Sequence, residues 1–115
     1  MIPFPARGKI YLVKIQGQPR DTKSRPALIV SLDVRNRLAN DVIVAPISTN
    51  LRPSPTHVEL SKGQGGLKRT SMVKCEQITC LDKSFLIRGP FSGTVSPGKM
   101  KEIEIAIQRA IGIVI

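Results

Sequence analysis

RPALIVS, residues 25–31, is a short apolar run that starts with a guanidinium and ends with a hydroxyl. A run of this length and composition is typical of a strand that is buried on both faces. A second buried strand is predicted over residues 42–47. Between the two runs, residues 33–38 can form one or two helical turns, with Asp33 as the candidate N-cap. These segments predict a core built on strands.

Shorter strand signals flank this pair of runs. Strands are predicted over residues 9–15, 57–60 and 71–79, with a weaker signal over residues 86–95 that Gly89-Pro90 interrupts. Residues 17–24 are predicted to form a polar loop, and the three glycines at positions 63, 65 and 66 a mobile one. Five or six short strands with short links are typical of a small, mostly antiparallel β-barrel.

The last part of the chain has a helical pattern instead. Ser96 is a good N-cap, and Pro97 is a good first helical residue. The following apolar residues recur at helical spacing: Met100, Ile103, Ile107, Ala110 and Ile111. We therefore expect a mainly β fold with a C-terminal helix packed against it. The apolar tail over residues 110–115 should either pack inside or contribute to a subunit interface.

Length and composition limit the class of protein. A chain of 115 residues with 41% hydrophobic residues is expected to form one domain over residues 1–115. Neither a signal peptide nor a membrane-spanning run is evident. Cys75 and Cys80 fit neither a CxxC redox motif nor a zinc knuckle. Two free thiols in the cytoplasm are expected, with a local disulfide as the alternative.

The charge balance is strongly basic. Lys and Arg total 18 against 8 Asp and Glu, a net charge of +10. Such an excess in a small domain indicates a polyanionic partner, either a nucleic acid or an acidic protein segment. The basic residues lie between the apolar runs rather than in one tail, which favours a folded basic face. Because aromatic residues are few, RNA affinity would rest on phosphate contacts and fall with salt.

Several polar side chains stand where predicted strands begin or end. Arg25 can bind phosphate through its planar fork, and the hydroxyls of Ser48 and Thr49 end the next buried strand. Lys74 and Glu76 are two apart on a predicted strand, so they should share a face. Taken singly, these are also the features of a surface arginine, a closed turn and a solvated salt bridge.

Histidine acid–base chemistry, metal binding and a P-loop have weaker support in the sequence. Three sequence features bear on them: His57 is the only histidine, Cys75 should face away from Lys74 and Glu76, and the glycine-rich stretch over residues 63–70 lacks P-loop spacing. A lone histidine that begins a strand is most often structural or on the surface. The sequence therefore offers neither a His pair for acid–base chemistry nor a plausible metal cluster, and no cofactor is expected.

Taken in order, the blocks resemble the MazF/PemK family of toxin endoribonucleases from bacterial toxin–antitoxin pairs. The blocks are GxIYLV, KSRPALIVS, VAPIST, PTHVEL and SxVKCEQI, followed by the amphipathic helix, and together they span roughly residues 7–113. The resemblance implies an SH3-like barrel of the CcdB/PemK type, a homodimer and an acidic antitoxin partner. It also implies metal-independent cleavage of single-stranded RNA at short recognition sequences.

The resemblance also implies roles for individual residues. The family's active-site arginine falls on Arg25 and its Ser/Thr on Ser48, while Lys74 and Glu76 occupy the positions of the PemK-type basic residue and carboxylate. Glu76 would be the general base, and Lys74 or Arg25 would assist the leaving group. The RNA-binding residues expected beside them are Arg20, Lys23, Thr49, Lys68, Arg69 and Gln77.

One stretch of this sequence departs from the pattern of the family. Many relatives have a Gly-x-Glu-Gln-like stretch before the Arg-Pro motif, whereas residues 17–24 here contain no glutamate, so the cleavage sequence cannot be transferred. Asp21 would partly replace the missing carboxylate.

Two rival functions stay open. The rivals are a toxin of the same fold that poisons DNA gyrase and a non-catalytic RNA- or ribosome-binding module.

Overall fold

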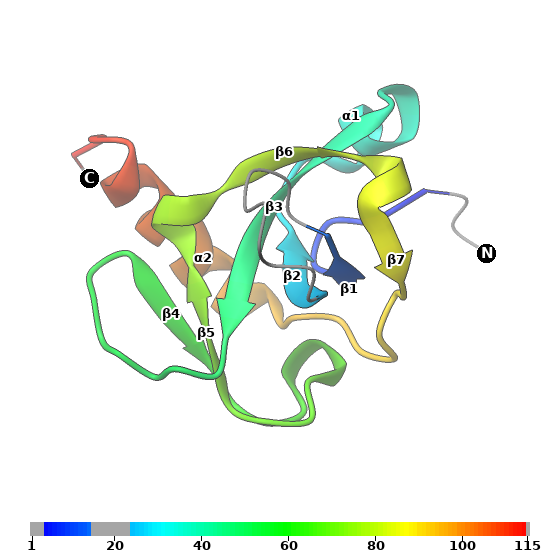
Figure 1. The fold of residues 1–115 in the computed structure, drawn as a ribbon. Coiled ribbons are helices and arrows are strands. Elements are labelled where there is room, and N and C mark those ends of the chain that lie inside the picture. Colours follow the sequence, from blue (N-terminus) through cyan, green and yellow to red (C-terminus); the bar gives the residue numbers. More distant parts are fainter. Residues whose placement is uncertain (1–3, 15–23, 115) are drawn as a thin grey trace.

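The computed structural model describes residues 4–14 and 24–114 (Figure 1). Within these residues the chain forms short strands, two α-helices and three one-turn 3-10 helices. The strands are β1 (Ile10–Val13), β2 (Arg25–Ile29), β3 (Asp41–Ser48), β4 (His57–Leu60), β5 (Ser71–Lys74), β6 (Thr79–Asp82) and β7 (Leu86–Arg88). The helices are α1 (Asp33–Leu38), η1 (Gln64–Gly66), η2 (Cys75–Gln77), η3 (Lys83–Phe85) and α2 (Pro97–Ala110).

The sheet is organised around β3. One edge of β3 pairs with β2, and its other edge is shared, with β6 beside Asp41–Val44 and β5 beside Ile47–Ser48. The strand order is β4-β5-β3-β2-β1-β7, and all the pairings are antiparallel. Among the described strands no pairing joins β4 to β7, so the sheet curves without closing. The expected mainly β fold with a C-terminal helix is confirmed, but the barrel is open.

Two apolar clusters fill the two faces of the sheet. In β2 the fully buried residues alternate, with Leu28 on the face that α2 covers and Ala27 and Ile29 on the other. The same holds along β3, which confirms that both strands are buried on both faces. The α2-facing cluster includes Ile10, Leu28, Ala45, Ile47, Val58, Leu60, Val73, Cys75, Met100, Ile103 and Ala106.

Helix α2 begins where the sequence predicts. The Ser96 hydroxyl caps it by accepting a hydrogen bond from the amide of Lys99 at 3.3 Å, and Pro97 is its first residue. Met100 and Ile103 are buried, as the helical spacing of the apolar residues predicts, but Ile111 is 61% exposed and Val114 96% exposed. The described part of this apolar tail, which ends at Val114, therefore does not pack inside the protomer. Ile115 lies outside the described residues. No helix among the described residues is long and apolar enough to cross a membrane.

Two predicted elements are wrong in detail. The strand over residues 71–79 is interrupted, because β5 pairs with the end of β3 and β6 with its beginning, so the chain turns through η2 between them. The N-cap of α1 is Leu32 rather than Asp33. Asp33 instead accepts a hydrogen bond from the backbone amide of Arg7 at 2.7 Å, which ties the N-terminal segment to this helix.

The predicted mobile glycine loop is a packed turn. Gly65 is buried with a φ of 62°, and an added Cβ would lie 2.5 Å from Cδ1 of Ile10. The side chain of Gln64 accepts a hydrogen bond from the amide of Ser96 at 3.0 Å. This turn is thereby attached both to β1 and to the start of α2.

Asn36 holds α1 against the sheet from a fully buried position. Its side-chain amide donates to the carbonyl of Ser31 at 2.9 Å, and the Ser31 hydroxyl bonds to its oxygen and accepts from the amide of Ile43. Asn36→Ala removes the buried donor to the Ser31 carbonyl and the acceptor of the Ser31 hydroxyl, so we expect it to lower the free energy of unfolding by about 1–3 kcal/mol. The matched change at exposed Asn40, Asn40→Ala, should leave chemical denaturation almost unaltered. Equal midpoints for the two variants would contradict this role.

The two cysteines should differ sharply in reactivity. Cys75 is fully buried, and that burial, with a smaller contribution from the Glu76 charge, raises the pKa of its thiol to about 12. Cys80 is exposed, and both thiols are free. A thiol reagent should therefore modify one cysteine in the native protein and two after unfolding. Native labelling that persists in Cys80→Ser would show that Cys75 is accessible.

Candidate active site

Three neighbouring strands place cations and a hydroxyl on the sheet face opposite α2. Ser48 pairs with Met72, and Lys74 lies two residues further along β5, so the side chains of Ser48 and Lys74 share a face. The β2–β3 register pairs Ala27 with Pro46, and continuing it by two residues sets Arg25 opposite Ser48. The fold therefore gathers Arg25, Ser48 and Lys74 on adjacent strands, which lie about 5 Å apart.

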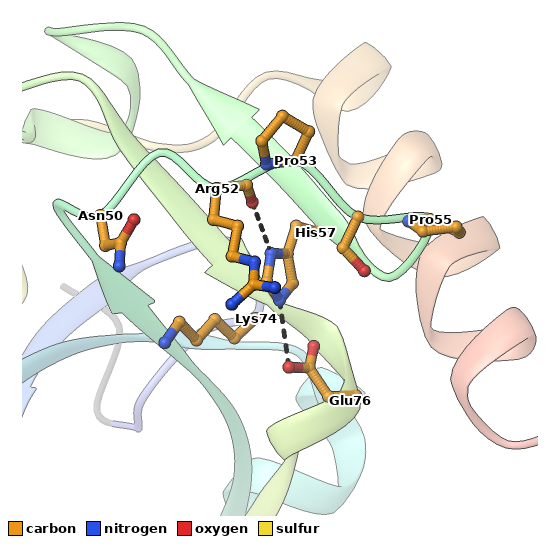
Figure 2. Close-up of a pocket in the computed structure, with 8 residues that line it drawn as sticks. Asn50, Arg52, Pro53, Pro55, His57, Lys74 and Glu76 are labelled. Carbon is orange, nitrogen blue, oxygen red and sulfur yellow. Dashed lines mark hydrogen bonds and ion pairs between the residues drawn. The ribbon is translucent and has the colours of Figure 1, made fainter.

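A hollow of about 480 Å³ opens at the end of this face (Figure 2). Its walls come from the β3–β4 connection, the start of β4, the end of β5 and η2. The lining residues are Asn50, Arg52, Pro53, Ser54, Pro55, His57, Lys74 and Glu76. The hollow thus combines one carboxylate, one imidazole and two cations.

Glu76 is held by two side-chain hydrogen bonds. Its Oε1 accepts from the hydroxyl of Thr56 at 3.1 Å, and its Oε2 lies 3.0 Å from Nε2 of His57. The amide of Cys75 donates to the carbonyl of Thr56 at 2.9 Å, which fixes η2 beside β4. Partial burial alone would raise the pKa of Glu76, but the bonds from His57, its own backbone and Thr56 outweigh it, and the pKa is lowered. Glu76 is therefore ionised and oriented at neutral pH.

His57 connects Glu76 to the β3–β4 connection. Its Nδ1 lies 2.8 Å from the carbonyl oxygen of Arg52, on the side of the ring away from Glu76 (Figure 2). The bond to that carbonyl raises the pKa of His57, and Glu76 raises it further, against opposing effects of burial and the Lys74 charge. The ring is mostly buried, whereas the carboxylate is 37% exposed, so Glu76 reaches solvent and His57 supports it from behind.

Lys74 and Glu76 line the same hollow, as predicted, but for a different reason. Glu76 is on η2 rather than on a continuous strand, so the alternation argument does not apply to it. In the described part of the chain, the ion pair of Glu76 is with His57 and none joins it to Lys74. Cys75 lies in the apolar core and faces away from the hollow, as predicted.

A second hollow, of about 440 Å³, lies on the other side of the end of β3. Thr49 lines this second hollow and Asn50 the first, whereas Ser48, the last residue of β3, lines neither. The Ser48 hydroxyl accepts a hydrogen bond from the amide of Asn50 at 3.1 Å. The second hollow has an apolar floor and three cations on its walls, and its lining includes Leu12, Pro26, Leu67, Lys68, Arg69, Arg88 and Phe91.

The residues expected from the sequence therefore fall into groups. Lys74 and Glu76 line the first hollow, while Thr49, Lys68 and Arg69 line the second. Arg25 is exposed at the start of β2, and Gln77, which is exposed at the end of η2, lines neither hollow. Arg20, Lys23 and Asp21 lie outside the described residues.

The first hollow is also lined by residues that the sequence does not predict for the site, among them Asn50, Arg52 and His57. The sequence alone favours a structural role for His57, because a lone histidine carries no spacing signal and its partner Glu76 is 19 residues away. Arg52 stands in a proline-containing connection that had only a loop signal. The net positive charge was the one hint that further cations would line a site.

The first hollow can perform acid–base and phosphate chemistry with side chains. An oriented carboxylate can accept a proton, and nearby ammonium and guanidinium groups can stabilise an anion. Among the described residues there is no group of three or more His, Cys, Asp or Glu that could hold a metal ion.

Comparisons with known proteins identify the family. Residues 6–111 match the family described as PemK-like, MazF-like toxin of type II toxin–antitoxin system. The chain is 35% identical over 112 residues to the endoribonuclease MazF of Staphylococcus saprophyticus, covering 93% of this chain and 91% of that protein.

Solved structures agree with this match in fold and extent. An endoribonuclease in complex with its cognate antitoxin from a mycobacterial species superimposes with a TM-score of 0.81 and 32% identity, covering 96% of this chain and 98% of that one. The Mycobacterium tuberculosis toxin MazF-mt6 gives a TM-score of 0.78 and 25% identity, covering 93% and 99%. The chain therefore belongs to the family of PemK-like, MazF-like toxins of type II toxin–antitoxin systems.

Proposed function

We propose that this protein is a metal-independent endoribonuclease that cleaves single-stranded RNA, and that it acts as the toxin of a toxin–antitoxin pair in the cytoplasm. The observation that carries the proposal is the oriented carboxylate of Glu76. It lies in a hollow with Lys74 and Arg52, at the end of the sheet face that bears Arg25 and Ser48. Side chains alone can thus supply a base, an acid and a phosphate clamp.

The first step is proton removal from a ribose 2′-hydroxyl. Glu76 takes this proton, and the 2′-oxygen forms a bond to the adjacent phosphorus. The lowered pKa of Glu76 keeps it ionised, while Thr56 and His57 fix its direction. The requirement for a 2′-hydroxyl makes RNA the substrate and leaves DNA inert.

The phosphorus then carries extra negative charge that the protein must stabilise. Arg25 offers two parallel N–H donors to non-bridging oxygens, and Ser48 or Thr49 donates a further hydrogen bond. The bond from phosphorus to the 5′-oxygen breaks as that oxygen receives a proton. We assign this proton to the Lys74 ammonium because it lines the same hollow as Glu76. The products are a 2′,3′-cyclic phosphate and a 5′-hydroxyl.

Substrate binding and inhibition use the same charge. We propose that the second hollow, with Lys68 and Arg69, continues the basic surface past Thr49 and holds neighbouring phosphates. Gln77, and Arg20 and Lys23 outside the described residues, are also expected to bind RNA. An acidic antitoxin segment would compete for this surface by electrostatic complementarity. We also propose a homodimer, with the exposed apolar tail that includes Ile111 and Val114 in the contact.

The reaction chemistry can be tested on the purified protein. A long RNA incubated in excess EDTA should be cut, and the new ends should be cyclic phosphates and 5′-hydroxyls. An otherwise identical strand with deoxyribose at the cleaved nucleotide should stay intact, because it has no nucleophile. Cleavage that requires added magnesium, or that cuts the deoxyribose strand, would overturn the mechanism.

The assigned roles predict graded losses of activity. Glu76→Gln removes the base and should lower the cleavage rate by about 10²–10⁴-fold. Arg25→Ala should lower it by about 10²–10³-fold, because a charge-stabilising donor is lost. The controls are Arg37→Ala on exposed α1 and Glu104→Gln on α2, where the carboxylate pairs with Arg7. Both should retain full activity.

The same variants separate the rival functions. A toxin that poisons gyrase by binding protein needs no acid–base residues, so Glu76→Gln would stay toxic to cells. A non-catalytic RNA-binding module would bind RNA and give no product under any condition. Loss of both toxicity and cleavage in folded Glu76→Gln and Arg25→Ala supports the ribonuclease.

A further inference from the structure

The ring of His57 faces a hydrogen-bond acceptor at each nitrogen. Nδ1 lies 2.8 Å from the carbonyl oxygen of Arg52, and Nε2 lies 3.0 Å from the carboxylate of Glu76. A carbonyl oxygen carries no proton, so Nδ1 must be the donor in that bond. A neutral imidazole has only one N–H, and its second nitrogen would then present a lone pair to the carboxylate. Both contacts are satisfied together only when the ring is an imidazolium.

The charges around the ring come from four directions. Glu76 on η2 is the anion, and Lys74 on β5 and Arg52 on the β3–β4 connection are cations of the same hollow. Arg109 on α2 donates to the carbonyl of Pro55 at 3.4 Å and adds a third cation beside the connection. Burial of the ring lowers the pKa of His57, and so does the charge of Lys74. The direct contacts to Glu76 and to the Arg52 carbonyl oppose that tendency.

We infer that His57 is a positioning residue whose imidazolium both aims the Glu76 carboxylate into the hollow and fixes the Arg52 end of the β3–β4 connection. This inference rests on the proposed ribonuclease activity. His57 keeps its proton during the reaction: the 2′-hydroxyl proton goes to Glu76, and His57 acts only through orientation and charge.

Loss of the ring proton has a defined structural consequence. A neutral ring with its proton on Nδ1 keeps the Arg52 carbonyl and repels the carboxylate. A ring with its proton on Nε2 keeps Glu76 and releases the connection that carries Arg52 and Asn50. Either outcome disorders one wall of the hollow. Because the pKa of Glu76 is lowered and that of His57 is raised, the intact arrangement is present between these two values, neutral pH included, and is lost as the pH rises through the raised pKa of His57.

The proton can be followed directly because His57 is the only histidine in the chain. A single set of imidazole NMR signals should titrate with a pKa above that of a free histidine. In Glu76→Gln the pKa should fall, since the paired anion and its hydrogen bond are gone. The control Glu104→Gln, on α2, should leave it unchanged. Equal histidine pKa values in all three proteins would overturn the proton sharing.

The catalytic consequence is read from pH profiles of RNA cleavage. Between about pH 5 and pH 9 the native enzyme should lose rate in the range where NMR shows His57 losing its proton. His57→Gln supplies a donor that does not titrate, so it should be slower by about tenfold at neutral pH and lack this decline. The inference would be contradicted if the cleavage rate of the native enzyme did not change over the pH range in which His57 titrates. It would also be contradicted if the rate of folded His57→Gln declined over that range as the native rate does.

The two experiments also separate this inference from the proposed function. If no RNA is cleaved under any condition, the ribonuclease proposal fails, and the positioning role fails with it even where the NMR titration shows a shared proton. If RNA is cleaved but His57→Gln matches the native profile, the ribonuclease stands and the role of His57 is wrong.

Discussion

Pairing along both edges of β3 is the constraint on which the rest of the structure depends. β2 takes one edge, and β6 and β5 divide the other, so the chain between β5 and β6 must turn through η2. That turn moves Glu76 out of the strand and sets it beside the start of β4. The same register sets Ser48 opposite Met72 on β5 and, when the β2 pairing is continued by two residues, opposite Arg25 on β2. Hydrogen bonding within the sheet thus fixes the spacing of the groups assigned to catalysis.

Much of this fold can be predicted from the sequence because buried elements have a strong pattern of apolar residues. The uninterrupted runs of β2 and β3 predict strands buried on both faces, and Ser96-Pro97 predicts the start of α2. Where the pattern depends on distant partners, prediction fails. Residues 71–79 look like one strand, but the far half pairs with a different part of β3. Gly65 signals a loop, yet its lack of a Cβ allows tight packing on Ile10.

The candidate site, like the fold, has one part that the sequence predicts and another that depends on distant contacts. Arg25, Ser48, Lys74 and Glu76 could be proposed from the order of the sequence blocks, and the structure places three of them on one sheet face and the fourth beside it. His57 could not, since its significance comes from two contacts made across the fold, to Glu76 and to the Arg52 carbonyl. Each is a single hydrogen bond between residues whose separation follows no motif. The basic charge of the chain can be interpreted from the sequence and from the structure. The sequence predicts a basic face, and in the structure cations line both hollows.

In the proposed complex, RNA is held with its scissile phosphate between the Arg25–Ser48 end of the sheet and the Glu76 carboxylate. The most direct measurement is a crystal structure of the protein with a short RNA whose scissile nucleotide carries 2′-fluorine in place of the hydroxyl. We predict that the phosphate contacts Arg25 and Ser48 and that the 2′-fluorine points toward Glu76. An RNA strand that leaves Glu76 facing solvent, with its phosphates elsewhere on the molecule, would contradict it.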